Sequence, residues 1–174
     1  ILKMKKLDLS IVIPCYNEEK IIFSTIKKIS NFFKNKNYEL IIIDDGSSDK
    51  TRNIVRKFDR VILNKERVNK GKGFSIKEGV LIAQGEFILI SDADLSAPIS
   101  EFQKLKKYIN KYEIVIGSRG LKNSQVNNYK YRIILGKIGR IFTRLIVSNI
   151  KDTQCGFKLF NARAARISFL PSPS

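Results

Sequence analysis

The chain of 174 residues contains no histidine and only two cysteines. Without histidine there can be no Ser-His-Asp or Cys-His catalysis and no histidine-ligated zinc. The two cysteines, Cys15 and Cys155, cannot form a four-thiolate metal site, and their separation does not suggest a disulfide framework. We therefore expect a protein of a reducing compartment.

Long apolar runs and negative charge are also scarce. No stretch approaches the roughly 20 apolar residues that span a bilayer, and residues 1–6 are basic without the apolar core of a signal peptide. There are 33 Lys+Arg against 16 Asp+Glu, a net charge of +17. Such a surface attracts polyanions such as nucleic acid, anionic lipid or phosphorylated substrates, although a face of solvated lysines explains the same composition.

Strand and helix patterns alternate along the chain, which is long and apolar enough to form a single domain over residues 1–174. Short β-branched runs predict strands at residues 9–13, 40–43, 60–63, 87–90 and 113–116. Apolar residues at helical spacing predict helices at residues 18–33, 49–58, about 76–83, and after Pro98. This order predicts an α/β fold with a mostly parallel central sheet and helices on both faces.

Two pairs of acidic residues follow predicted strands. Asp44 and Asp45 come directly after residues 40–43, and Asp92 and Asp94 follow residues 87–90. Because ligands of parallel sheets bind beyond the carboxyl ends of the strands, these acids predict one shared polar crevice. Hard oxygen ligands suit Mg²⁺ or Mn²⁺, which also bridge substrate phosphates, so Asp92 and Asp94 predict a metal that holds a diphosphate. Two acids so spaced are also common in ordinary turns.

Glycine and basic residues add further candidates. The segment Asn69-Lys70-Gly71-Lys72-Gly73 precedes a predicted helix, where glycine lets a ligand approach the backbone and a helix N-terminus favours anions. A flexible basic loop is the plain alternative. Arg119 ends the last predicted strand and Arg132 begins a basic segment; guanidinium groups bind phosphate oxygens in pairs.

Two late segments are open to more than one interpretation. Residues 129–149 have an apolar stripe and a basic remainder, typical of a helix on a membrane surface or of a packed helix with a solvated side. Asp152 is the only acid after Glu113, which makes it the one late candidate for a base or an acceptor contact.

Taken in order, these segments resemble family 2 glycosyltransferases, inverting enzymes of the GT-A fold, and among them most the dolichyl- and polyprenyl-phosphate branch. The resemblance runs from about Ser10 to Phe160 and implies a Rossmann-like nucleotide-binding half. The matching segments are Ile11–Glu19, Asp44–Asp49, Asn69–Gly73, Asp92–Ser96, Gly117–Arg119, Tyr131–Arg132 and Asp152–Lys158.

The resemblance implies roles residue by residue. The nucleotide-sugar would be bound by Pro14, Tyr16, Asn17, Glu18, Asp44, Asp45, Gly46, Lys70, Gly71, Lys72, Asp92 and Ala93, with Asp45 on the uracil. Asp92 and Asp94 would hold the Mg²⁺ or Mn²⁺. The phosphate of the lipid acceptor would be held by Arg119, Arg132 and Gln154. The catalytic set would be Asp92, Asp94, Asp152 and Arg119.

The implied reaction is inverting transfer of a sugar, glucose in this branch, from a UDP-sugar to polyprenyl or dolichyl phosphate. An acceptor phosphate is largely ionised at neutral pH, since its second pKa is about 6, so no strong base is needed. The resemblance implies a cytoplasmic protein with peripheral contact to the cytoplasmic membrane face and no nucleic-acid partner. The family pattern continues beyond Ser174, so we also expect a catalytic domain truncated at its C-terminus.

Three other interpretations stay open. The acceptor could be a sugar hydroxyl in polysaccharide or glycolipid synthesis, with Asp152 as the base. A truncated chain could bind a nucleotide-sugar without turnover. A nucleic-acid-binding module would explain the charge of +17 but leaves the acids at the strand ends unexplained.

Overall fold

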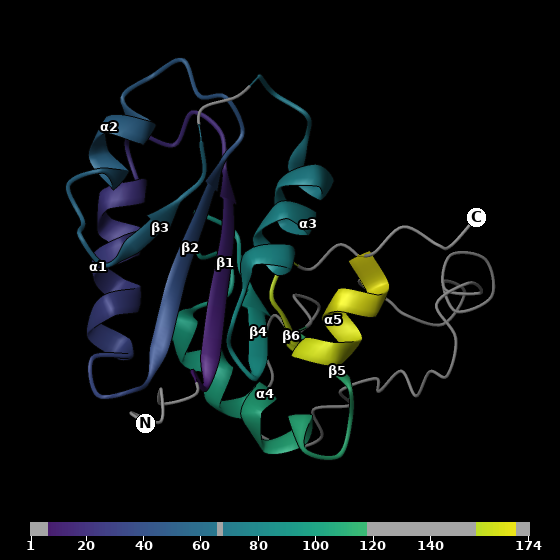
Figure 1. Ribbon diagram of the computed structural model, residues 1–174. Coiled ribbons are helices and arrows are strands. Elements are labelled where there is room, and N and C mark those ends of the chain that lie inside the picture. The colour runs from purple at the N-terminus through teal and green to yellow at the C-terminus, as the bar shows by residue number, and fades with distance from the viewer. Residues whose placement is uncertain (1–6, 66–67, 118–155, 170–174) are drawn as a thin grey trace, which may run out of the picture.

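The computed structural model describes residues 7–65, 68–117 and 156–169, which form one sheet with helices packed on it (Figure 1). The strands are β1 (Leu9–Cys15), β2 (Tyr38–Asp44), β3 (Val61–Leu63), β4 (Phe87–Ile90), β5 (Ile114–Ile116) and β6 (Lys158–Asn161). The helices are α1 (Ile22–Phe32), α2 (Thr51–Val55), α3 (Lys72–Ile82), α4 (Phe102–Ile109) and α5 (Ala162–Phe169), with a 3₁₀ turn (Ile99–Glu101) before α4.

The sheet has the order β3-β2-β1-β4-β6-β5 and is mostly parallel. β1 pairs in parallel with β2 and with β4, and β2 pairs in parallel with β3. Among the strands that the structure describes, only β6 runs the other way, between β4 and β5. The predicted α/β fold is therefore confirmed, and the carboxyl ends of β1, β2 and β4 share one edge.

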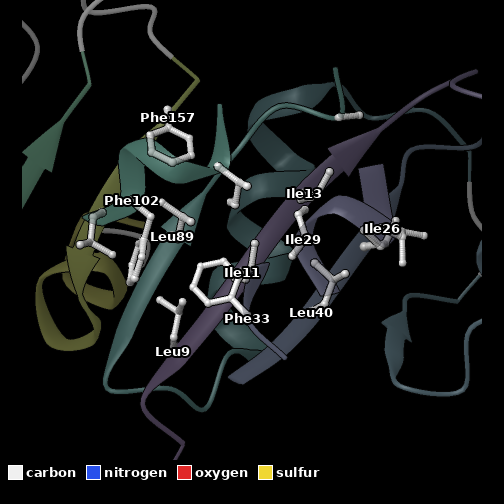
Figure 2. Packing of buried hydrophobic residues seen from close by; sticks show 14 of the residues in the cluster. Leu9, Ile11, Ile13, Ile26, Ile29, Phe33, Leu40, Leu89, Phe102 and Phe157 are labelled. Atoms are coloured by element: carbon white, nitrogen blue, oxygen red, sulfur yellow. The ribbon is translucent and has the colours of Figure 1, made fainter. Parts of the chain in front are cut away.

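Both faces of the sheet are buried, each under its own helices. Alternate strand residues enter one cluster with α1 and α4; in Figure 2 these include Ile11, Ile13, Leu40 and Leu89. The residues between them, among them Val12, Ile41, Ile43, Ile88 and Ile90, pack with α3 and α5. The near-continuous apolar strands thus follow from burial on two sides, as predicted.

The predicted helices occur with different limits: α1 and α2 are shorter than predicted, whereas α3 begins earlier, at Lys72 rather than at about residue 76. The stripe Ile22, Ile26, Ile29 and Phe33 is buried at 1% exposure or less, but α1 begins at Ile22 rather than Glu18. The helix expected over residues 49–58 is limited to Thr51–Val55. Residues 129–149 lie outside the described chain. Among the helices that are described, none combines the length and apolarity needed to cross a bilayer.

Candidate functional site

A cavity of about 370 Å³ opens at the carboxyl ends of β1, β2 and β4 and at the start of α3. The predicted edge for ligand binding is therefore the edge that is hollowed. The cavity is lined by Pro14, Cys15, Tyr16, Glu18, Asp45, Asn69, Gly71, Lys72, Ser75, Asp92, Ala93 and Asp94.

The cavity brings most of the predicted donor-site residues together. The predicted residues that line it are Pro14, Tyr16, Glu18, Asp45, Gly71, Lys72, Asp92, Ala93 and Asp94. Those that do not line it are Asn17, Asp44, Gly46 and Lys70. Arg119, Arg132, Asp152 and Gln154 lie outside the described residues. Cys15, Asn69 and Ser75 also line the cavity, although the sequence analysis assigned none of them a role in binding the nucleotide-sugar.

Asp92 and Asp94 follow β4 and differ in their partners. The Lys72 ammonium, at the start of α3, lies 2.5 Å from Asp92 Oδ1. Asp94 accepts hydrogen bonds from the backbone N–H and the hydroxyl of Ser96, at 2.9 and 2.5 Å. Asp94 is exposed, and the Asp92 side chain is 17% exposed, so both carboxylates can meet a ligand.

Negative charge is concentrated around this pair. Burial first, and then the charges of Asp94, Asp49 and Asp92, raise the pKa of the Glu18 carboxyl. A cation in the cavity would relieve this repulsion. The local field therefore favours a positively charged ligand beside Asp92 and Asp94.

Two carboxylates suit a metal that the substrate completes. Within residues 7–65, 68–117 and 156–169, no group of three or more acidic, histidine or cysteine side chains is placed to hold a metal. Mg²⁺ is often held by one or two carboxylates together with waters and substrate phosphates, and Mn²⁺ takes the same oxygen ligands. Asp92 and Asp94 fit this partial ligand set.

Gly156 packs directly against the Asp92 carboxylate. A Cβ at Gly156 would lie 1.9 Å from Asp92 Oδ2, closer than any real contact. The next residue, Phe157, is buried, and its carbonyl accepts a hydrogen bond from the Gly117 N–H at 2.9 Å. The segment that leads into β6 therefore forms one wall around Asp92. The resemblance matches this segment to the family pattern but assigns no role to Gly156.

Asp45 holds the loop that precedes α3. Its two carboxylate oxygens accept hydrogen bonds from the backbone N–H groups of Lys70 and Gly71, at 2.9 and 2.8 Å. Gly71 has a φ of +89°, a conformation that favours glycine. Asp45 is 3% exposed and lines the cavity. Its carboxylate is therefore part of the cavity wall and also holds the backbone before Lys72.

Asp44, the neighbour of Asp45, has a different environment. It is fully buried, and its Oδ2 lies 3.5 Å from Arg52 Nη1 on α2. Its backbone exchanges two hydrogen bonds with the Asn64 side chain, at 2.8 and 3.0 Å. Burial and the Asp44 charge raise the pKa of the adjacent Cys15 thiol, which keeps Cys15 protonated and excludes it as a nucleophile.

Asn17 joins the loop after β1 to the loop after β2. Its side-chain oxygen accepts a hydrogen bond from the Ser48 N–H at 2.9 Å, and its own N–H donates to the Ser47 hydroxyl at 2.9 Å. Asn17 has a φ of +55°, which asparagine tolerates better than most residues. Its contacts fix the loop that carries Tyr16 and Glu18.

Asp49 extends the same connection. Its carboxylate accepts hydrogen bonds from the N–H groups of Glu19 and Thr51, at 3.0 and 2.9 Å. Its slight burial acts to raise its pKa, but the hydrogen bonds from Thr51 and Glu19 outweigh burial and lower the pKa. Asp49 therefore ties the two loops together, but the predicted cap is wrong: the N-cap of α2 is Lys50, and no side chain makes a cap hydrogen bond there.

The family comparison matches residues 10–167 to the model for glycosyl transferase family 2. Among curated proteins, the chain is 35% identical over 182 residues to the dolichyl-phosphate beta-glucosyltransferase ALG5A of Trichomonas vaginalis, covering 93% of this chain and 55% of that protein. It is 34% identical over 184 residues to the human dolichyl-phosphate beta-glucosyltransferase, covering 92% and 57%. The chain thus spans about half the length of the curated relatives it matches.

Two solved structures share the fold. Glucosyl-3-phosphoglycerate synthase from Mycobacterium tuberculosis, in complex with Mn²⁺, UDP-glucose and phosphoglyceric acid, aligns with a TM-score of 0.64 at 22% identity, over 90% of this chain and 57% of that one. TarS 1-349 from S. aureus, in complex with UDP-GlcNAc, aligns with a TM-score of 0.59 at 20% identity, over 90% and 46%. At these identities the likeness concerns the fold.

Proposed function

The chain belongs to glycosyl transferase family 2 and has the GT-A fold, and we propose that it transfers glucose with inversion from a UDP-sugar to polyprenyl or dolichyl phosphate. One observation carries the proposal: a single cavity is lined by Asp92, Asp94, Lys72 and Asp45. We further propose that residues 1–174 form one catalytic domain. The similarity to dolichyl-phosphate beta-glucosyltransferases supports this choice of sugar and acceptor.

The cavity offers two chemically different ends to a nucleotide-sugar. Pro14, Tyr16 and Asp45 would take the uridine end, since an aromatic ring and a carboxylate can cover and hydrogen-bond a base. Lys72, Asp92 and Asp94 would take the diphosphate end. Lys72 is the positively charged residue among those that line the cavity, and its side chain is 57% exposed, so it can turn towards a phosphate.

Asp92 and Asp94 would hold the Mg²⁺ or Mn²⁺. When bound, the metal would supply positive charge against the charge that develops on the departing UDP. The described residues contribute the rest of the donor side: Asp45 orders the backbone before Lys72, and the Asn17 and Asp49 contacts hold the loop of Tyr16 and Glu18.

We propose that Arg119, Arg132 and Gln154 bind the acceptor phosphate, and that Asp152 completes the catalytic set. These assignments rest on the sequence motifs. A phosphate oxygen that is ionised at neutral pH can attack the anomeric carbon without a strong base, which suits a chain that lacks histidine. We also propose peripheral contact with the cytoplasmic membrane face, where a lipid-linked phosphate would be presented.

The experiment incubates the chain with radiolabelled UDP-glucose and Mn²⁺, in one reaction with polyprenyl phosphate and in another with oligosaccharides. Label should enter the lipid, and Asp94→Asn should lower transfer about 100-fold or more. Asp59→Asn, at an exposed acid away from the cavity, is the matched control and should transfer normally. Label in the oligosaccharide alone would favour the sugar-hydroxyl acceptor, and full activity of Asp94→Asn would contradict the metal assignment.

A further inference from the structure

Thr25 on α1 is bonded to the loop between the two cavity acids. Its hydroxyl donates a hydrogen bond of 2.6 Å to the carbonyl oxygen of Ala93, which lies between Asp92 and Asp94. Thr25 is 3% exposed and does not line the cavity. It therefore contacts the backbone of the loop from behind and is not placed to touch a ligand itself.

The direction of this hydrogen bond is informative. A threonine inside a helix commonly donates its hydroxyl to the carbonyl one turn earlier in its own helix. The neighbouring Ser24 does this, with a bond of 2.9 Å to the carbonyl of Ile21. Thr25 instead reaches across to a residue 68 positions later in the sequence.

The loop needs such support because it lies beyond the strand ladder. The Ser91 N–H donates to the Val12 carbonyl at 3.1 Å, and the chain then turns within a few residues. The Leu95 N–H donates to the Asp92 carbonyl at 3.1 Å, and Leu95 has a φ of +49°, which is unfavourable for a leucine side chain. A turn with this strain persists only where surrounding contacts hold it.

Ala93 is held from both directions. Its methyl group belongs to the buried cluster on the α1 face, at 4% exposure, so its carbonyl oxygen is shielded from water and needs a donor. Thr25 supplies that donor. The buried methyl group and the hydrogen-bonded carbonyl group of Ala93 thereby fix the backbone from which the carboxylates of Asp92 and Asp94 extend.

We propose that Thr25 is a positioning residue that sets the spacing of Asp92 and Asp94 for a divalent cation shared with a nucleoside diphosphate. This inference rests on the proposed function. Mg²⁺ demands near-ideal octahedral geometry, so a small shift between two ligands weakens binding. Partners that orient metal ligands from outside the ligand set typically contribute 10-fold to 100-fold in affinity.

The test compares Thr25→Val, which keeps the shape and loses the hydroxyl, with Thr25→Ser, which keeps the hydroxyl. Thermal unfolding of the full chain is followed during a Mn²⁺ titration at saturating UDP. Thr25→Val should raise the half-saturating Mn²⁺ concentration about 10-fold to 100-fold, whereas Thr25→Ser should stay close to the unchanged chain. Ser24→Ala removes the adjacent hydroxyl as a matched control and should not alter the titration.

Hydrogen exchange of the Leu95 amide gives a readout that needs no ligand. Exchange should accelerate in Thr25→Val and stay slow in Thr25→Ser, because the Leu95 N–H closes the turn onto Asp92. If Thr25→Val does not fold, Thr25→Ser and Thr25→Ala form a second pair that differs only by the hydroxyl. An effect on stability alone, with unchanged Mn²⁺ dependence and unchanged Leu95 exchange, would overturn the proposal.

The two proposals fail in different ways. If the unchanged chain shows no Mn²⁺-dependent stabilisation by UDP, the proposed function is contradicted and with it the metal role of Thr25. If the unchanged chain responds and Thr25→Val responds at the same Mn²⁺ concentration, the positioning role alone is overturned.

Discussion

Acidic residues at the carboxyl edge of the sheet lie in two environments, one on each face. On the α2 side, Asp44 is fully buried against Arg52 and is bonded through its backbone to Asn64. On the α3 side, Asp92 faces the cavity and is paired with Lys72, whose side chain is 57% exposed. Burial fixes the partners of Asp44, whereas a ligand can replace Lys72 as the partner of Asp92.

The energetics of the two environments explain this division. A buried charge that loses its partner cannot be solvated, so removing one member of a buried pair typically costs about 3–5 kcal/mol. An ion pair at the surface is typically worth about 0–1 kcal/mol. A ligand can therefore displace Lys72 from Asp92 at little cost, whereas the contact between Asp44 and Arg52 belongs to the fold.

The largest expected effect tests the buried side of this comparison. Asp44→Asn keeps the side-chain shape but removes the negative charge that lies 3.5 Å from the Arg52 guanidinium, whose side chain is 11% exposed. The free energy of unfolding should fall by about 3 kcal/mol, the lower end of the range for a broken buried pair. Urea unfolding, followed by circular dichroism, measures the change as a lower midpoint with an unchanged slope.

Asp59→Asn is the matched control for this variant, because it makes the same change at an exposed acid that follows shortly after α2. Its unfolding free energy should stay within about 0.5 kcal/mol of the unchanged chain. Equal midpoints for Asp44→Asn and Asp59→Asn would show that Asp44 does not stabilise the fold.

Strand alternation explains why two adjacent acids have such different roles. Ile42 packs on the α1 face and Ile43 on the α3 face, and the alternation continues into Asp44 and Asp45. Asp44 thus meets Arg52 of α2, and Asp45 meets the loop before α3. The sequence predicted that both acids follow a strand, but not which helix each would face, because periodicity alone does not assign helices to faces.

The wall formed by Gly156 could not be predicted from local pattern. β6 is four residues long, runs against the other strands and enters the sheet between β4 and β5. Its position depends on pairing with strands distant in sequence, which a short apolar run does not specify. Asp92 and Asp94 were predictable because β4 lies in the regular alternation of strands and helices. The contact between Gly156 and Asp92 was not predictable, because it depends on where β6 enters the sheet.

The second expected effect tests the cavity side of the comparison. Gly156→Ala places a methyl group where the Asp92 carboxylate lies, since its Cβ would be 1.9 to 2.3 Å from the three carboxylate atoms. The carboxylate is the far end of a side chain and can move, so the fold should persist while Asp92 is displaced. Sugar transfer should fall about 10-fold to 100-fold, because misplacement by about 1 Å can cost 100-fold.

Gly73→Ala is the matched control for stability, because a Cβ at Gly73 on α3 would meet no atom within 4 Å. Alanine in a helix is favoured over glycine by about 1 kcal/mol, so this variant should be at least as stable as the unchanged chain. Normal transfer by Gly156→Ala in the same assay would show that the packing of Gly156 against Asp92 is not needed to position the carboxylate.

The smallest expected effect concerns Glu18, at the border between the two environments. Burial, followed by the charges of Asp94, Asp49 and Asp92, raises the pKa of Glu18 above its value in the unfolded chain. The folded chain therefore holds the Glu18 proton more tightly, and stability falls as the pH rises from the unfolded pKa through the folded pKa. Glu18→Gln should remove this loss and raise the melting temperature at pH 7 by at most about 2 °C, since much of Glu18 is screened by solvent.

The pH dependence makes this small change decisive. At pH 3.5 Glu18 is protonated in most folded and most unfolded chains, so Glu18→Gln and the unchanged chain should melt at nearly the same temperature. Mn²⁺ with UDP at pH 7 should also shrink the difference, because a cation beside Asp92 and Asp94 removes part of the repulsion that Glu18 meets. Differential scanning calorimetry at the two pH values measures the effect. A gain that is equal at both values would mean that Glu18→Gln acts through packing, and that the acids of the cavity do not repel one another.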